Sequence, residues 1–260
     1  MIAPVTPFDA ARFQEALSAR AIGRFLLYRT STETTMTLAR READEGAPHG
    51  TMALAEEQTA GRGRRGRSFY SPAGQNLYFT LVLRLGMEAH RLLPVSVPLA
   101  VCRAIRAEGV DARIKWPNDI WVGDRKVCGM LIDAEITPAG GLALPGIGIN
   151  VNGDPTVLPE LRETATSLRR ELGREVEREG LLARICNELE RTLACGREEL
   201  IEEYRSLSMI LGRLVIVQSA VGEAWSGEAM GIADDGELVV LRPTGEVETV
   251  TAADVSVRPG

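Results

Sequence analysis

Apolar and polar positions alternate in two different ways along the chain. Over the first 208 residues, segments with the two-residue period of strands are interspersed with segments that have the ~3.6-residue period of helices. Strands are predicted at residues 25–28, 51–58, 77–85, 112–116, 119–122, 127–135 and 142–152. Helices are predicted at residues 9–23, from a hydroxyl-rich turn to Gly46, at 96–108 with Ser96 as the cap, at 165–172 behind a cap, and at 178–204 with a break near Cys195–Gly196. This mixture indicates an α+β domain.

The end of the chain follows a different pattern. From Leu211 onward, five short strand patterns follow one another with no helical segment between them. Turns are expected at Val221-Gly222, Asp234-Asp235-Gly236 and Pro243-Thr244-Gly245. Five strands joined by tight turns are typical of a small barrel. We therefore divide the chain into a domain at residues 1–208 and a second domain at residues 209–260.

Residues 61–67, G-R-G-R-R-G-R, form a loop that suits an anion. Three glycines alternate with four arginines; glycine lets the backbone approach a ligand, and arginine gives bidentate contacts to phosphate or carboxylate. The spacing is not that of a Walker A loop, and no helical pattern follows as in a Rossmann fingerprint. An RNA-binding Arg-Gly segment and a solvated charge run are the alternatives. Because the run is single, short and set between two predicted strands, we favour an anion-binding loop that is mobile without ligand.

Lysine is rare in this chain. Of the 30 basic residues, 28 are Arg, and only Lys115 and Lys126 are Lys. Where arginine serves nearly everywhere, a retained lysine indicates a place that requires a compact ammonium group. The chain is predicted to fold back as a hairpin that brings Asn118, Asp119 and Lys126 within reach of one another, and Gly129 in its second arm indicates a close neighbour. The alternatives are chance survival of two lysines and a plain surface salt bridge, which contributes roughly 0–1 kcal/mol.

Hydroxyl side chains gather between the first predicted strand and the helix that follows it. Residues 30–36, T-S-T-E-T-T-M, hold five of them, whereas capping a helix uses one. Capping is the simpler interpretation of the cluster. The surplus hydroxyls Ser31 and Thr32 are candidates for ligand binding at the junction between strand and helix.

Composition narrows the class of protein. The net charge of −6 argues against nucleic acid as the main partner, because neutralising phosphate requires a basic surface. The four cysteines form no C-x-x-C pair and there are two histidines, so we expect no zinc cluster and reduced thiols of a cytoplasmic protein. No signal peptide pattern and no run of eighteen apolar residues is present, so we expect neither export nor membrane spanning.

Three separated motifs occur in order: G-R-G-R-R-G-R-S-F-Y-S-P-A-G-Q-N-L-Y-F-T, K-W-P-N-D-I-W-V-G-D-R-K-V-C-G-M-L and G-I-G-I-N-V-N. Together they resemble the catalytic core of biotin protein ligases, also called biotin–[acetyl-CoA-carboxylase] ligases, and the resemblance extends through the C-terminal barrel. It implies a core similar to class II aminoacyl-tRNA synthetases, with a mixed sheet and helices on one side, followed by an SH3-like domain.

The resemblance also implies an activity and its partners. Members of the family couple biotin to ATP as biotinyl-5′-AMP, with Mg²⁺ as the counter-ion of ATP, and then pass biotin to one lysine of a biotin carboxyl carrier protein or domain. We expect a monomer or homodimer that does not contact a membrane. Some members carry an N-terminal winged helix that represses transcription. Thirty residues precede Ser31 here, which is too few for such a domain, so we expect a ligase without DNA binding.

Site residues follow from the resemblance, position by position. The residues expected to bind biotin are Ser31, Thr32, Glu33, Gln58, Gly61, Arg62, Gly63, Arg64, Lys126 and Gly129. The residues expected to bind ATP or the adenylate are Arg62, Arg67, Phe69, Asn118, Asp119, Lys126 and Asn150. Lys126, Asp119 and Arg64 are the expected catalytic residues, with Asp119 orienting or deprotonating the incoming lysine. Glu33 departs from the family, which usually has Asn there, and a carboxylate cannot donate the hydrogen bond that an amide can.

Two rival functions remain open at this point. A lipoate or octanoate ligase or transferase has a related fold and would bind a similar acid, but the Gly-Arg loop and the K-W-P-N-D motif together favour biotin. A noncatalytic nucleotide- or RNA-binding module built on the Gly-Arg loop is the other rival.

Overall fold

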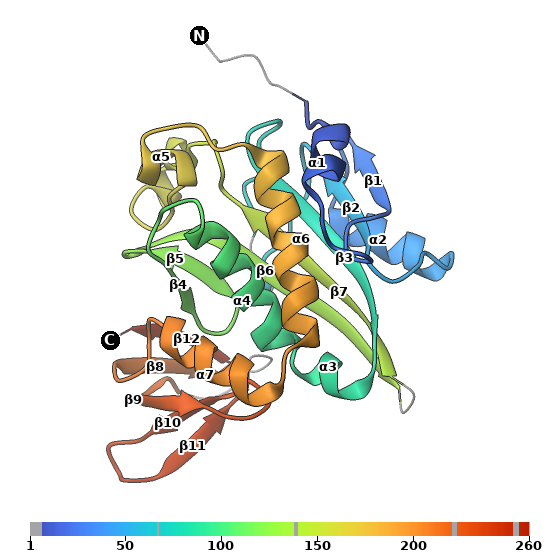
Figure 1. The fold of residues 1–260 in the computed structure, drawn as a ribbon. Coiled ribbons are helices and arrows are strands. Elements are labelled where there is room, and N and C mark those ends of the chain that lie inside the picture. The colour runs from blue at the N-terminus through green and yellow to red at the C-terminus, as the bar shows by residue number, and fades with distance from the viewer. Residues whose placement is uncertain (1–6, 67, 138–139, 220–222, 252–254, 260) are drawn as a thin grey trace.

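The protein contains two sheets (Figure 1). The strands of one lie between residues 26 and 149, and those of the other between residues 214 and 259. The computed structural model describes residues 7–66, 68–137, 140–219, 223–251 and 255–259. Within these residues, a seven-stranded sheet with its helices forms the larger part, and a five-stranded sheet forms the C-terminal part. No helix in the described ranges has the length and apolar character needed to cross a bilayer.

The larger sheet is mixed, as expected. Its strand order is β1 (Leu26–Arg29), β2 (Thr51–Ala55), β3 (Leu77–Leu85), β7 (Gly140–Ile149), β6 (Arg125–Thr137), β5 (Asp119–Val122) and β4 (Ala112–Lys115). β1 and β2 are parallel, and every other neighbouring pair is antiparallel. The α+β prediction is therefore confirmed. β5 and β6 form the predicted hairpin, which follows a cis peptide bond between Trp116 and Pro117.

Helices cover both faces of this sheet, so the expectation that they lie on one side is wrong. On β3, Leu77, Phe79, Leu81 and Leu83 enter the main core, whereas Val82 packs with residues of α2 (Thr35–Asp44) in a second cluster. Alternate residues of a strand point to opposite faces. The main-core face carries the long helices α4 (Leu93–Arg106) and α6 (Arg178–Ala194) with α1 (Ala10–Ala16), α3 (Met87–Arg91) and α7 (Arg197–Leu207) around them (Figure 1). α5 (Leu168–Leu172) follows β7.

Two predicted helices have wrong boundaries. α4 begins at Leu93, with a proline in its first turn, and Ser96 lies inside it and donates its hydroxyl to the Leu92 carbonyl instead of capping. The first helix ends at Ala16 and not at residue 23, because the backbone that follows is held by side chains of α6. The cap predicted before α5 is also missing: Ser167 stands at the N-cap position, but its hydroxyl makes no cap hydrogen bond.

The C-terminal sheet confirms the five predicted strands. Its order is β11 (Val247–Val250), β10 (Leu238–Leu241), β9 (Trp225–Ile232), β8 (Leu214–Ser219) and β12 (Val255–Pro259), and all pairs are antiparallel. The turn between β9 and β10 reaches the larger sheet, where the buried Trp116 indole N–H donates to the Gly236 carbonyl at 2.9 Å. A Cβ on Gly236 would lie 2.8 Å from Val95 of α4. The two parts of the chain are thus packed together next to the K-W-P-N-D motif.

Candidate active site

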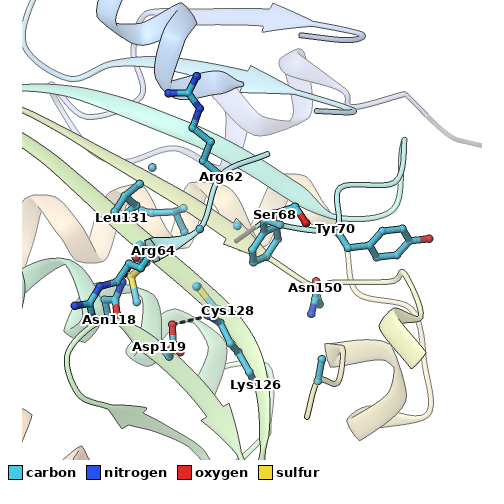
Figure 2. A pocket seen from close by; sticks show the side chains of 18 of the residues that line it. Arg62, Arg64, Ser68, Tyr70, Asn118, Asp119, Lys126, Cys128, Leu131 and Asn150 are labelled. Atoms are coloured by element: carbon cyan, nitrogen blue, oxygen red, sulfur yellow. Dashed lines mark hydrogen bonds and ion pairs between the residues drawn. The ribbon is translucent and has the colours of Figure 1, made fainter. Parts of the chain in front are cut away.

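A cavity of about 650 Å³ lies on the α2 face of the larger sheet (Figure 2). Its size is within the range of roughly 300–1,000 Å³ that small-molecule sites occupy. It is lined by the N-terminus of α2, the Gly-Arg loop, the ends of β4 to β7 and the segment before α5. Pieces of chain that are far apart in the sequence therefore share one cavity, which includes both predicted segments, the Gly-Arg loop and the β5–β6 hairpin.

Glycines on β6 and β7 make room for this cavity. A Cβ on Gly148 would lie 2.6 Å from the Phe69 ring, and one on Gly129 would lie 2.7 Å from Lys126 Nζ. On Gly146 the added atom would lie 2.8 Å from Met36. Since real Cβ atoms do not approach so closely, any larger residue at these positions would displace a side chain of the cavity wall.

The β5–β6 hairpin supplies the charged end of the cavity. Lys126 Nζ lies 2.7 Å from Asp119 Oδ1, and both side chains are mostly buried, with exposed fractions of 34% and 25% (Figure 2). Asn118 donates its amide N–H to the Met130 carbonyl across the same hairpin, and its Oδ1 accepts from Arg64 at 3.4 Å. The hairpin thus presents one ammonium, one carboxylate and one amide together, and the Gly-Arg loop is joined to it through Arg64.

The Gly-Arg loop closes on itself at its base. Phe69 N–H donates to the Gly61 carbonyl at 2.9 Å, and a Cβ on Gly61 would lie 2.7 Å from the Phe69 carbonyl oxygen. Arg62 leaves the cavity wall in the opposite direction to Arg64 (Figure 2). Its guanidinium lies 3.7 Å from the carboxylate of Glu33, and both side chains are 61% exposed. The two arginines of this loop therefore face different partners.

The N-terminus of α2 supplies the uncharged polar end. Thr34 caps the helix by accepting from Met36 N–H. Gln58 Oε1 accepts from Thr35 N–H at 2.9 Å, and Gln58 Nε2 donates to Ser71 at 3.2 Å. Backbone N–H groups at a helix N-terminus favour groups with negative charge or lone pairs. This end can therefore accept a polar neutral head group, whereas the hairpin end suits an anion.

Comparison with known proteins agrees with this arrangement. Residues 26–152 match the model of the biotin/lipoate A/B protein ligase family, and residues 210–258 match that of the biotin protein ligase C-terminal domain. A biotin–[acetyl-CoA-carboxylase] ligase of Mycobacterium tuberculosis is 31% identical, over 85% of this chain and 84% of the relative. The bifunctional ligase/repressor BirA of Bacillus subtilis is also 31% identical, over 92% of this chain and 76% of the relative. The chain belongs to the biotin protein ligase family.

Solved structures of family members have the same fold as this ligase family chain. The biotin protein ligase of Aquifex aeolicus in complex with biotin and ATP aligns with a TM-score of 0.77 and 25% identity, over 92% of this chain and 100% of that one. The Leishmania major ligase in complex with biotinyl-5-AMP aligns with a TM-score of 0.63 and 25% identity, over 88% and 100%.

The structure brings most of the predicted site residues of this ligase together. The predicted residues that line the cavity are Gln58, Arg62, Gly63, Arg64, Phe69, Asn118, Asp119, Lys126, Gly129 and Asn150. Of the remaining predicted residues, Ser31, Thr32, Glu33 and Gly61 are not among the described residues that line it. Arg67 lies outside the described residues. The roles assigned to all of these residues remain predictions.

The hydroxyl cluster reaches the cavity with different members from those expected. Ser31 is exposed, and Thr32 extends the edge of the sheet by pairing with Gln58. Thr34, which caps α2, and Thr35, which had no role of its own in the sequence analysis, line the cavity. Thr35 shares a hydrogen bond of 2.9 Å with buried Thr80. Sequence reasoning also gave no role to the glycines of β7, although their alternation, G-I-G at residues 146–148, is a readable signal for an open strand face.

Replacing Gly148 with alanine is expected to raise the KM for ATP about tenfold. The new methyl group would overlap the Phe69 ring, at 2.6 Å and 2.7 Å from two of its atoms, so the ring must leave its place on the cavity wall. Steady-state kinetics with ATP varied at saturating biotin measures the effect. Gly231→Ala, a glycine in a strand with open space around its Cβ, is the control, and an equal KM in both variants would contradict the assignment of Phe69 to the nucleotide wall.

Proposed function

We propose that this protein activates biotin with ATP as biotinyl-5′-AMP and then transfers biotin to a lysine of a biotin carboxyl carrier protein or domain. The observation that carries the proposal is the shared cavity, in which the Gly-Arg loop, the Lys126–Asp119 pair and the N-terminus of α2 meet. Family membership supports it, since two relatives are named biotin–[acetyl-CoA-carboxylase] ligases. One structural neighbour was solved with biotin and ATP, and another with biotinyl-5-AMP.

In the first step, a carboxylate oxygen of biotin attacks the α-phosphorus of ATP, and the bond to the β-phosphate breaks to release pyrophosphate. Two negatively charged groups must approach each other, so cations and N–H donors contribute more than a nucleophile of the protein would. Lys126 is the proposed contact of the biotin carboxylate and the α-phosphate, a role supported by its place beside Asp119 at the charged end of the cavity. Arg64, which bonds to the neighbouring Asn118, is proposed to assist it. Mg²⁺ enters with ATP and belongs to the substrate.

In the second step, the amine of the acceptor lysine attacks the carbonyl carbon of biotinyl-5′-AMP, and AMP leaves. The amine must lose a proton for the amide bond to form. Asp119 is the candidate acceptor of that proton or the group that orients the amine, since it lies in the cavity wall at 2.7 Å from Lys126. No covalent bond to the protein is formed in either step, and positioning of the two reactants supplies much of the rate.

Biotin-dependent exchange of radiolabelled pyrophosphate into ATP tests this function directly. We expect exchange with biotin, and none with lipoate or octanoate or without an added acid. Calorimetric titration with each acid separates a biotin ligase from a lipoate ligase. Exchange that does not depend on biotin, or ATP binding without exchange, would refute the proposal and favour a nucleotide-binding module.

The cellular setting is part of the proposal. The four cysteines are free, three of them buried, and their reduced state fits the cytoplasm, where carboxylases and ATP are available. The net charge of −6 speaks against DNA as a partner. The acceptor is a carboxyl carrier, by analogy with relatives that are named for acetyl-CoA carboxylase. A monomer or homodimer suffices for this chemistry, because the cavity is formed within one chain.

Glu33 is proposed to hold the guanidinium of Arg62 away from the biotin site before biotin binds. Their ion pair is exposed and spans 3.7 Å, and such pairs contribute roughly 0.2–1 kcal/mol. Glu33→Gln keeps the size and removes the charge, so we expect the KM for biotin to fall two- to fivefold. Glu45→Gln, at the other end of α2, controls for net charge. A higher biotin KM in Glu33→Gln would instead indicate that the carboxylate contacts biotin directly.

A further inference from the structure

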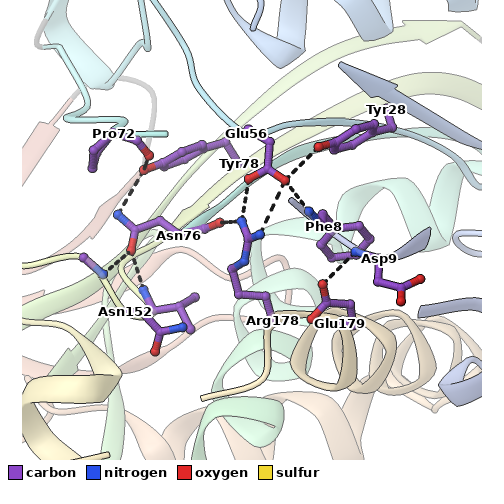
Figure 3. A network of polar contacts seen from close by, with 12 residues as sticks. Phe8, Asp9, Tyr28, Glu56, Pro72, Asn76, Tyr78, Asn152, Arg178 and Glu179 are labelled. Atoms are coloured by element: carbon purple, nitrogen blue, oxygen red, sulfur yellow. Dashed lines mark hydrogen bonds and ion pairs between the residues drawn. The ribbon is translucent and has the colours of Figure 1, made fainter. Parts of the chain in front are cut away.

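A buried network of polar side chains joins the end of β2, the segment before β3 and the start of α6 (Figure 3). At its centre, Arg178 from the start of α6 forms an ion pair of 2.7 Å with Glu56, and both side chains are at most 7% exposed. Burial alone would raise the pKa of Glu56, but hydrogen bonds from Arg178 and from the Phe8 N–H outweigh it and lower that pKa. The network therefore stays ionised, and a fixed guanidinium lies beside the segment that precedes β3.

Asn76 connects this network to the cavity. Its backbone carbonyl accepts from Arg178 at 3.2 Å. Its side-chain Oδ1 accepts from Val151 N–H at 2.8 Å and from Gly153 N–H at 3.0 Å. Val151 directly follows Asn150, and Gly153 lies three residues after it. A Cβ on Gly153 would lie 2.8 Å from the Asn76 amide nitrogen, so the two segments are in close contact. Asn76 thereby fixes the course of the chain just after Asn150.

The other end of the same amide fixes the opposite wall. Asn76 Nδ2 donates to the Tyr78 hydroxyl at 2.9 Å, and that hydroxyl donates to the Pro72 carbonyl at 3.1 Å. Pro72 lies three residues after Phe69, and the Tyr78 ring meets the Phe69 ring edge to face with centroids 6.3 Å apart. Phe69 and Asn150 lie on the two cavity walls between which the adenylate part of ATP is expected to bind.

We propose that Asn76 is a positioning residue for the nucleotide, because one buried amide sets the distance between the Phe69 wall and the Asn150 wall. The inference rests on the proposed function, but it concerns only nucleotide binding. Biotin is expected at the other end of the cavity, where Gln58 and Thr35 bond to each other. Gln58 is joined to the Phe69 carbonyl through Ser71, by hydrogen bonds that do not include Asn76. Loss of the amide should therefore weaken nucleotide binding selectively.

The test measures binding of a nonhydrolysable ATP analogue and of biotin by calorimetry, together with the two KM values. Asn76→Ala is expected to weaken the analogue and to raise the KM for ATP about tenfold, while affinity and KM for biotin stay within about twofold. A residue with a merely structural role would not separate the two ligands. If both affinities change equally, or neither changes, the inference is wrong.

Tyr28→Phe is the matched control. The Tyr28 hydroxyl donates to Glu56 at 2.8 Å, so this variant removes one hydrogen bond from the same network without touching Asn76. We expect it to lower the melting temperature and to leave both ligands unaffected. A tenfold loss of nucleotide affinity in Tyr28→Phe would show that general loosening of the network suffices, and would overturn the role of Asn76.

Two further variants keep the inference testable if Asn76→Ala does not fold. Asn76→Asp keeps the acceptor for Val151 and Gly153 and is expected to bind the analogue better than Tyr78→Phe, which releases Pro72. Nucleotide affinity equal to the wild type in both variants would refute the inference. The proposed function fails separately, if the wild-type protein shows no biotin-dependent pyrophosphate exchange; the binding measurements still decide the role of Asn76.

Discussion

Replacing Lys126 with alanine is expected to lower biotin-dependent pyrophosphate exchange at least a hundredfold. Lys126 presents an ammonium group at the charged end of the cavity, 2.7 Å from Asp119, where negative charge from two reactants meets. Removing one donor that contacts developing charge typically costs about 2.7–4 kcal/mol of transition-state stabilisation. The variant also removes the cation that is paired with Asp119. The Asp119 carboxylate would then repel the anionic substrates. Exchange measured at saturating ATP and biotin reports the loss.

Arg125→Ala is the control for Lys126→Ala. Arg125 precedes Lys126 on the same hairpin, but its guanidinium binds Glu171 at 2.8 Å and is not among the described residues that line the cavity. We expect near-normal exchange in that variant. Lys126→Arg should not restore activity, since a planar guanidinium is larger than the compact ammonium group that lies against Gly129. Wild-type exchange in Lys126→Ala would remove the basis of the proposed mechanism.

Replacing Asp119 with asparagine is expected to separate the two steps of the reaction. Transfer of biotin from preformed biotinyl-5′-AMP to a carrier lysine should fall about a hundredfold, within the roughly 10²–10⁴-fold range for loss of a general base. Pyrophosphate exchange should change little, because Lys126 remains and no longer has a carboxylate competing with the substrate for its charge. Single-turnover transfer and exchange, measured on the same preparation, give the two rates.

Asp124→Asn is the matched change for this experiment. Asp124 lies at the exposed turn of the same hairpin, so it alters the net charge equally without entering the cavity. We expect both half-reactions to be normal in that variant. An Asp119→Asn protein that lost exchange and transfer to the same extent would indicate that Asp119 serves only to hold Lys126 in place.

Sequence reasoning was most successful where chemistry is local. The hairpin, the Gly-Arg loop and the five C-terminal strands each depend on neighbouring residues, and their patterns identified them. The rarity of lysine likewise directed attention to Lys126 before any contact was known. Each of these features is determined by the types of residues that lie within a few positions of one another in the sequence.

Features that depend on tertiary packing were harder to predict. The early end of α1 depends on contacts with distant residues, such as Asn187 of α6. That α2 covers the second face follows from Val82 and its neighbours, which a single strand pattern does not distinguish from the main core. In the hydroxyl cluster, sequence alone cannot tell which of five adjacent side chains turns inward, because helix phase decides it.

The indole of Trp116 has an implication for dissecting the chain. Trp116 lies two residues before Asn118 in the sequence. Its N–H donates a hydrogen bond to the Gly236 carbonyl in the turn between β9 and β10. A fragment that ended after α7 would leave the Trp116 N–H without its acceptor. It would also expose one side of the segment that carries Asn118 and Asp119. The C-terminal sheet is accordingly a structural support of the larger domain, because it supplies the hydrogen-bond acceptor for a buried residue next to the site.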